Sequence, residues 1–221
     1  MHKINFPLST KVERIIAKDR IFKQTAVSDK IKHLFVEQVD RIRCIYEITA
    51  QTLNLKSSDQ VPKIFIIQIS SKANELSLDI LKTIDAAFQV PVIFELVQNK
   101  KTQYIASYRR RSEMDHRKWI HSQYFFSDSI NDKNEETVPF VLSMEKLYHH
   151  LLKQIIPIQV AKEESFSLFI ERAASIEQMQ KQADRLLLRV NKEKQYNRRV
   201  ELNQEYKKLL VSIEEKQSIL N

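Results

Sequence analysis

The hydrophobic pattern is clearest between Val90 and Ser112, where two alternating runs are joined by a polar turn. Both faces of the first run are mostly apolar, which is typical of a strand inside a sheet rather than at its edge. The turn Gln98–Lys101 lacks glycine, but Asn99 can adopt a positive φ angle at modest cost. This pattern predicts a central β-hairpin whose second strand runs into Arg109-Arg110-Arg111.

The segment before this hairpin changes its period once. Ser28 is a suitable N-cap, and the apolar positions that follow it have helical spacing as far as Val39. From Arg41 the apolar positions alternate, so we expect a helix that ends near Val39 and a strand that starts near Arg41. A continuous helix through Thr52 is the competing interpretation.

A strand, a helix and the hairpin then follow one another. Lys63–Ser71 is apolar on both faces, and Asn74–Phe88 is amphipathic at helical spacing and is closed by Pro91. A strand–helix–strand unit of this kind predicts two parallel strands with a right-handed crossover. Further along, we expect a strand over Trp119–Phe126, a polar loop over 128–137 and a helix over Ser143–Ile156.

The C-terminal region, from Lys162 to Asn221, contains neither proline nor glycine. Its apolar residues form a heptad-like seam that fails between Asn191 and Arg199, which predicts either one long helix with a stutter or a helical hairpin. The seam must be covered by this protein's own core, a second copy or another protein. The residues that we assign to such partner binding are Leu187, Val190, Leu202, Tyr206, Leu209 and Ile213.

These elements predict an α/β (α+β) fold with a mixed sheet of roughly 4–6 strands and flanking helices. Residues 1–160 would form the core, which is compatible with a restriction-endonuclease-like arrangement, and residues 161–221 a helical or coiled-coil arm.

Composition narrows the function classes. The 221 residues are 43% hydrophobic with a formal net charge of +8, which favours an anionic partner such as nucleic acid, although an ordinary basic protein has the same composition. The single cysteine, Cys44, and the lack of a long apolar run or signal-peptide core indicate a cytoplasmic protein. The complete absence of glycine excludes the glycine-rich phosphate loops, and we expect no cofactor.

Catalytic residues are not expected in the principal interpretation. A restriction-type nuclease needs an acidic residue on one strand and a Glu-x-Lys or Asp-x-Lys on the next to hold a divalent ion. Val97 stands where that lysine should follow Glu95. A divergent or degenerate nuclease would have to use Asp85, Glu95 and Lys72, and the histidine spacing predicts no metal site.

Basic residues and aromatic residues are interleaved along the hairpin and the segment after it. Cationic side chains at a strand end can reach phosphates, and aromatic rings can stack on bases. The alternative is a solvated strand end with core aromatics. The candidate nucleic-acid-binding residues, which we call the hairpin patch, are Lys100, Lys101, Tyr104, Tyr108, Arg109, Arg110, Arg111, Arg117 and Lys118.

Several segments resemble a bacterial family, the domain of unknown function 4391. They are the opening Leu8–Val12 with Lys18, the passage LFVEQVDRIRCIYEI, the TLNL at Thr52–Leu55, the strand before Lys72, IDAAFQVPVIFEL and ASYRR. The resemblance covers residues 7–126 and part of the tail. It implies an accessory protein beside helicases and DNA methyltransferases in restriction-like antiviral islands, and it supplies no catalytic residues.

The sequence therefore predicts a non-catalytic accessory or adaptor subunit of a DNA-targeting defence system. Its partner would be a helicase or a DNA methyltransferase, with DNA contacted through the hairpin patch. Two alternatives stay open: the divergent nuclease, and a structural protein that forms a homodimer through its C-terminal arm.

Overall fold

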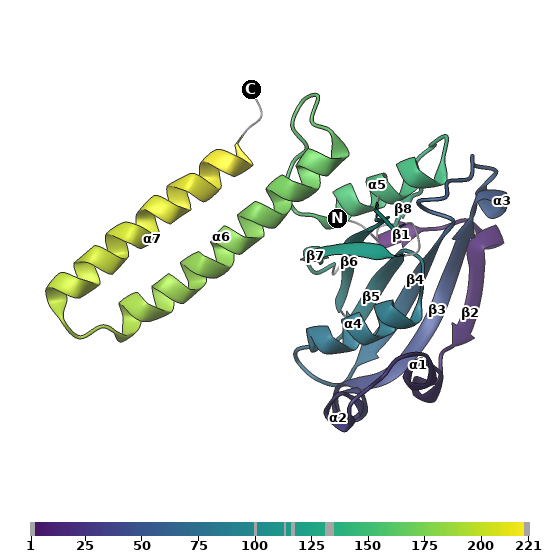
Figure 1. The fold of residues 1–221 in the computed structure, drawn as a ribbon, viewed down its shortest axis with the longest axis horizontal. Helices are drawn as coiled ribbons and strands as arrows, with labels where there is room; N and C mark the ends of the chain where they lie inside the picture. Colours follow the sequence, from purple (N-terminus) through teal and green to yellow (C-terminus); the bar gives the residue numbers. More distant parts are fainter. Residues whose placement is uncertain (1–2, 100, 113, 116–117, 131–134, 219–221) are drawn as a thin grey trace. The chain divides into compact units, whose positions relative to one another are not determined.

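The computed structural model describes residues 3–99, 101–112, 114–115, 118–130 and 135–218. The chain divides into two compact units, Met1–Pro157 and Ile158–Asn221 (Figure 1). The elements of the first unit are β1 (Lys3–Asn5), η1 (Leu8–Thr10), β2 (Lys11–Ile15), α1 (Lys18–Gln24), α2 (Asp29–Gln38), β3 (Val39–Thr49), α3 (Ala50–Leu53), β4 (Lys63–Ser71), α4 (Leu78–Ala87), β5 (Val92–Gln98), β6 (Lys101–Arg111), β7 (Trp119–Phe126), β8 (Glu135–Thr137) and α5 (Met144–Ile155).

A mixed sheet with the order β2-β3-β4-β5-β6-β7 forms the centre of this unit. The strands β4 and β5 are parallel and are joined through α4, whereas the other neighbouring strands pair antiparallel. The predicted parallel pair and the predicted central hairpin are thus confirmed. Asn99 has a φ angle of 48° in the hairpin turn, as expected for a turn without glycine.

The change of period near Val39 is a change from helix to strand. The helix α2 ends at Gln38 and β3 begins at Val39, so the alternative of a continuous helix through Thr52 is wrong. Strand β3 pairs along its whole length with β4, and these tertiary hydrogen bonds hold the alternating segment extended.

Two predicted elements differ in detail from the structure. Helix α4 begins at Leu78 rather than at Asn74, because the side chain of Ser77 accepts a hydrogen bond from the backbone N–H of Asp79 and caps it. The predicted loop 128–137 contains the short strand β8, which pairs in parallel with β1. No local pattern indicates β8, because its partner lies at the other end of the unit's sequence.

Helices α1, α2 and α4 cover one face of the sheet (Figure 1). The apolar cluster beneath them includes Ile21, Phe35, Ile67, Ile69, Ile80, Leu81, Ile84, Phe94, Leu96 and Ile105. We call this side of the sheet the α4 face and the opposite side the α5 face. On the α5 face, the ring of Tyr148 from α5 lies 6.1 Å from that of Tyr108.

The second unit is a helical hairpin formed by α6 (Phe166–Lys192) and α7 (Tyr196–Gln217), which pack against each other. The segment in which the seam fails contains the turn, so a single long helix is not formed. No helix among the described residues is both long enough and apolar enough to cross a membrane.

The two helices of the hairpin cover most of the seam that we assigned to a partner. Ile213 is buried in the cluster between α6 and α7, with Tyr206 and Leu209 packed against it. Val190 and Leu202 are also buried, which leaves only Leu187 exposed, at 37%. The assignment of the buried Val190, Leu202 and Ile213 to partner binding is therefore corrected, since they stabilise the hairpin itself. The assignment of the half-buried Tyr206 and Leu209 stays a prediction.

Candidate nucleic-acid interface at one end of the sheet

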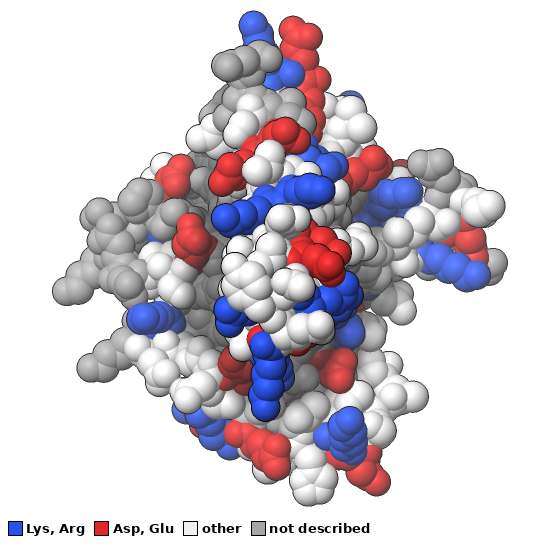
Figure 2. Space-filling view, turned by 90° about the vertical axis from the view of Figure 1, so that its left-hand side faces the viewer, with Lys and Arg blue, Asp and Glu red and all other residues white. Residues whose placement is uncertain are grey.

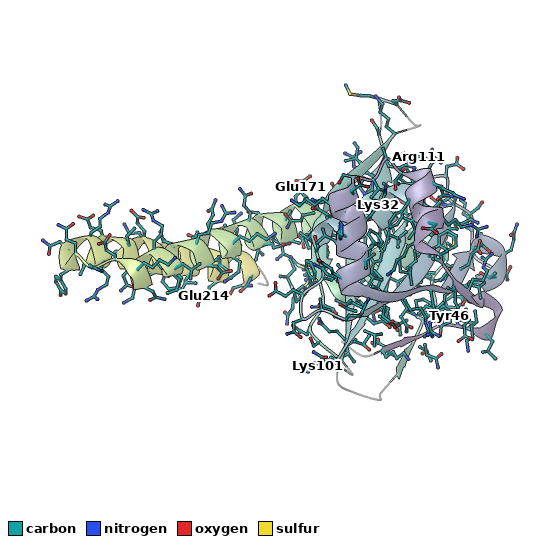
Figure 3. The ribbon with its side chains drawn as sticks, turned by 90° about the horizontal axis from the view of Figure 1, so that it is seen from below. Lys32, Tyr46, Lys101, Arg111, Glu171 and Glu214 are labelled. Atoms are coloured by element: carbon teal, nitrogen blue, oxygen red, sulfur yellow. The ribbon has the colours of Figure 1, made fainter. Side chains whose placement is uncertain are left out.

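The two ends of the hairpin patch are far apart. Strand β6 has 11 residues, and an extended strand of that length spans about 33 Å. Lys101 lies at the turn, and Arg111 lies at the opposite end of the strand (Figure 3). The residues of the hairpin patch therefore do not form one continuous surface. Two of its members, Lys100 and Arg117, lie outside the described residues.

Four described residues lie where β6 ends and β7 begins, and we call Arg110, Arg111, Lys118 and Trp119 the arginine edge. Arg111 is directly opposite Trp119 in the strand register, and its guanidinium carbon lies 4.8 Å from the centre of the Trp119 ring. The backbone N–H of Ser112 donates to Lys118 O at 2.8 Å, which brings Lys118 back beside the arginines. Lys118 is 79% exposed and lies 3.9 Å from the carboxylate of Asp115.

A cavity of about 200 Å³ adjoins the arginine edge. It is lined by Tyr108 and Arg110 on one side and by Glu145 and His149 of α5 on the other. Burial lowers the pKa of His149 to about 4, with a smaller contribution from Lys153, so this imidazole is neutral at pH 7. The neutral ring adds no charge to this cavity, whose wall contains the cation of Arg110 and the carboxylate of Glu145.

The loop before β4 supports this edge. The backbone N–H of Arg111 donates to Gln60 Oε1 at 3.0 Å, and Arg111 Nε donates to Asp59 O at 3.1 Å. These bonds and the contact with Trp119 limit the freedom of the Arg111 side chain. An ordered arginine loses less conformational entropy when it binds a phosphate.

Arg109 has a different role from its two neighbours. Its side chain is only 4% exposed, and Nη1 lies within hydrogen-bond distance of three carbonyl oxygens at the end of α4: Asp85 O at 3.2 Å, Phe88 O at 2.5 Å and Val90 O at 2.8 Å. The last carbonyls of a helix lack partners within that helix, and a cation satisfies them well. The assignment of Arg109 to nucleic-acid binding is therefore corrected, since this buried side chain holds the end of α4.

Asp85 lies beside Arg109 on the α4 face. Its carboxylate accepts hydrogen bonds from the hydroxyl of Tyr124 at 2.5 Å and from that of Ser107 at 3.4 Å, and Arg109 Nη1 is 3.9 Å away. Burial raises the pKa of Asp85 to about 6, while the hydrogen bond from Tyr124 and the charge of Arg109 act in the opposite direction. We call these four side chains the Asp85 cluster.

A second set of hydrogen-bonded polar side chains lies across the α5 face of the sheet. Arg43, Gln68, Glu95 and Tyr104 are register neighbours on β3, β4, β5 and β6. Arg43 Nε donates to Gln68 Oε1 at 3.1 Å, Gln68 Nε2 donates to Glu95 Oε1 at 2.6 Å, and the Tyr104 hydroxyl donates to Glu95 Oε2 at 3.1 Å. We call these residues the cross-strand row.

The cross-strand row explains why Tyr104 cannot stack on a base. Its side chain is 1% exposed, and its hydroxyl also accepts a hydrogen bond from the backbone N–H of Ile4 at 3.3 Å. The assignment of Tyr104 to nucleic-acid binding is corrected for this reason. Alternation along β6 indicated which residues share a face with Tyr104, but not that this face is covered.

The structure does not bring together the three residues of the nuclease alternative. Asp85 lies on the α4 face and Glu95 on the α5 face, so the sheet separates their carboxylates. Lys72 Nζ donates to Val36 O at 2.7 Å, next to α2. Among the described residues there is no group of three His, Cys, Asp or Glu side chains that could hold a metal ion.

Comparison with known proteins gives a match to a family model. Neither the curated proteins nor the solved structures contain a match to this chain. The family model described as Domain of unknown function (DUF4391) matches residues 4–212, a range that begins within β1 and ends within α7. The chain therefore belongs to the DUF4391 family.

Proposed function

We propose that this protein is a non-catalytic accessory subunit of a bacterial DNA-targeting system, and that it contacts nucleic acid through the arginine edge. The observation that carries the proposal is the presence of Arg110, Arg111 and Lys118 at one end of the sheet, where Arg111 lies against the ring of Trp119. Cationic side chains of this kind bind phosphates without reading the base sequence.

The partner would be a helicase or a DNA methyltransferase in an antiviral defence island, as the family resemblance implies. Of the seam residues, Leu187 is exposed for such a contact, and Leu188 beside it is 59% exposed. The basic residues of the arm contribute less to the proposal, because Arg198 is paired with Glu201 at 2.7 Å. The side of the molecule shown in Figure 2 accordingly mixes acidic and basic side chains.

Binding of fluorescent single-stranded and duplex DNA, measured by anisotropy over a range of salt concentrations, tests the contact. The double variant Arg110→Gln/Lys118→Gln removes two charges from the arginine edge. It should weaken binding and reduce the slope of log K against log salt by about 0.7–0.9 for each phosphate that the variant no longer neutralises.

The matched control is Lys32→Gln/Lys82→Gln, which removes two exposed charges from α2 and α4. If the control weakens binding as much as the test variant does, the effect is one of net charge and the arginine edge does not bind the DNA. An unchanged affinity and salt slope in the test variant would also contradict the proposal.

The protein partner is tested by recovering the tagged full-length chain from its native host, with and without nuclease treatment. Recovery of a helicase or methyltransferase after nuclease treatment, and its loss in a Leu187→Glu/Leu188→Glu variant, would support docking on the arm. Recovery of only a second copy of the chain would favour the self-associating alternative.

A further inference from the structure

A cavity of about 700 Å³ lies on the α4 face, between α1, β2 and the segment that follows α4. This volume falls within the range of about 300–1,000 Å³ that small-molecule sites occupy. The cavity is independent of the arginine edge, with which it shares no lining residue.

Three cations from three different elements line this cavity: Arg14 of β2, Arg20 of α1 and Lys63 of β4. None of its described lining residues is Asp or Glu. The nearest carboxylate partner is Glu47, which lies 2.7 Å from Arg14 Nη2 and 2.7 Å from Lys63 Nζ. Since one carboxylate pairs with two of the three cations, the site retains a positive charge that suits an anionic group.

A β-bulge places Arg14 at the cavity. The register between β2 and β3 shifts between Lys11 and Arg14, and Glu13 within the shift has a φ angle of 45°. A positive φ is uncommon for a residue other than glycine, and it persists only where the surrounding structure holds it. After the bulge Arg14 is opposite Cys44, which also lines the cavity. Bulges at sheet edges often redirect a side chain toward a site in this way.

Aromatic surface lies beside these charges. The rings of Phe65 and Phe88 both line the cavity, with centres 5.3 Å apart and planes inclined at 65°. Lys63 Nζ lies 5.4 Å from the centre of the Phe65 ring, so a cation and a flat apolar face are presented together. This combination recognises a phosphate joined to a planar base.

Two further observations favour binding over chemistry at this place. Arg109 donates to Phe88 O and Val90 O, which lie in the cavity wall, so a buried ion holds that wall in position. Burial raises the pKa of the Cys44 thiol to about 11, so this lining group is neutral at pH 7 and is a poor nucleophile.

We propose that this cavity binds a phosphorylated nucleoside, either free or as the 5′ end of a nucleic-acid strand. The phosphate would lie against Arg14, Arg20 and Lys63, and the base against Phe65 and Phe88.

Titration calorimetry with the full chain tests this site. The probes are the nucleoside 5′-monophosphates, the matching nucleosides, inorganic phosphate, and one short oligonucleotide with either a 5′-phosphate or a 5′-hydroxyl. Saturable binding of a nucleoside monophosphate should be at least about tenfold tighter than binding of either the nucleoside or inorganic phosphate. Binding of the 5′-phosphorylated oligonucleotide that depends on its phosphate would instead identify a strand end as the source.

The test variant is Arg20→Gln, because Arg20 is exposed on α1 and its loss should leave the fold intact. We expect the dissociation constant to rise about tenfold. The matched control, Arg41→Gln, removes an exposed arginine from β3 on the α5 face and should leave binding unchanged. A second variant, Phe88→Leu, should weaken the binding of the nucleoside monophosphate but leave the affinity for inorganic phosphate unaltered.

Three results would overturn the proposal: no saturable binding of any phosphorylated probe at millimolar concentration, equal affinity for inorganic phosphate and for the monophosphates, or equal losses in Arg20→Gln and Arg41→Gln. None of these results depends on the arginine edge, so the proposed function is tested separately.

Discussion

The two faces of the central sheet each bury a polar network, and the networks are built differently. On the α4 face, the Asp85 cluster contains one buried anion, one buried cation and two hydroxyl groups that donate to the anion. On the α5 face, the cross-strand row links four neighbouring strands at one register and ends at Arg43, which is only half-buried. Both ions of the first network are buried, and we call it the closed network. The second network has a cation, Arg43, at its partly exposed end.

The two networks explain why the buried carboxylates of Asp85 on α4 and Glu95 on β5 do not indicate a catalytic site. A buried charge is costly unless a partner satisfies it, so each of these side chains has partners within the core. Asp85 and Glu95 are satisfied by different neighbours on opposite faces. Both carboxylates therefore serve the fold, and the sheet lies between them.

The largest effect on stability should come from removing the buried cation of the closed network. Arg109→Met removes the cation that faces Asp85 and leaves the carbonyls at the end of α4 without their donor. We expect the free energy of unfolding to fall by about 3–5 kcal/mol, measured by urea denaturation of the full chain. Arg110→Met is the matched control and should lower the free energy of unfolding by much less. Similar losses in the two variants would contradict the structural role of Arg109.

A smaller loss is expected in the cross-strand row. Glu95→Ala leaves the Gln68 amide and the Tyr104 hydroxyl without an acceptor, which should cost about 2–3 kcal/mol in the same measurement. Glu136→Ala, at an exposed carboxylate on β8, controls for the loss of a negative charge. If Glu95→Ala were as stable as this control, the row would contribute nothing to folding.

The pH dependence should distinguish the two faces. The folded-state pKa of Asp85 is raised from 3.8 to about 6, so the folded state binds this proton more tightly than the unfolded state does. Stability from this group is therefore present below pH 4 and is lost as the pH rises from 4 to 6, by about 1–3 kcal/mol.

The lowered pKa of His149 acts in the opposite direction over part of this range, so a comparison with Asp85→Asn is needed to isolate the effect. Denaturation at pH 4, 5 and 6 should show that the wild type loses stability relative to Asp85→Asn as the pH rises. The exposed control Asp79→Asn should not change the trend. A difference that is constant with pH would show that Asp85 does not titrate in this range.

The smallest effect should come from a single hydroxyl at the end of the row. Tyr104→Phe keeps the ring but removes the donor to Glu95 and the acceptor for Ile4 N–H, which should cost about 1 kcal/mol. In a double-mutant cycle with Glu95→Ala, the two losses should be less than additive, because they share one hydrogen bond. Strict additivity would mean that the two side chains do not interact.

Much of the architecture was predictable from local patterns. Strands β4 and β7 have the bounds that the sequence predicted, and the parallel pairing of β4 with β5 followed from the helix between them. The arginine edge was partly predictable, because a strand that ends in three arginines must place some of them at the edge of a sheet. The burial of Arg109 was not predictable, since it depends on the carbonyls of α4, which precede it by about 20 residues.

The sequence by itself determined which segments have the alternating apolar positions of a strand, which have helical spacing, and which glycine-dependent phosphate loops are lacking. These properties depend only on residues that are close together in the sequence. Only the tertiary structure decided that Lys101 and Arg111 lie at opposite ends of one strand, that Tyr104 is covered and that α6 and α7 cover each other's seam. A periodic pattern shows which side chains share a face. What covers that face depends on segments distant in the sequence, so only the packed structure shows which charges reach the surface.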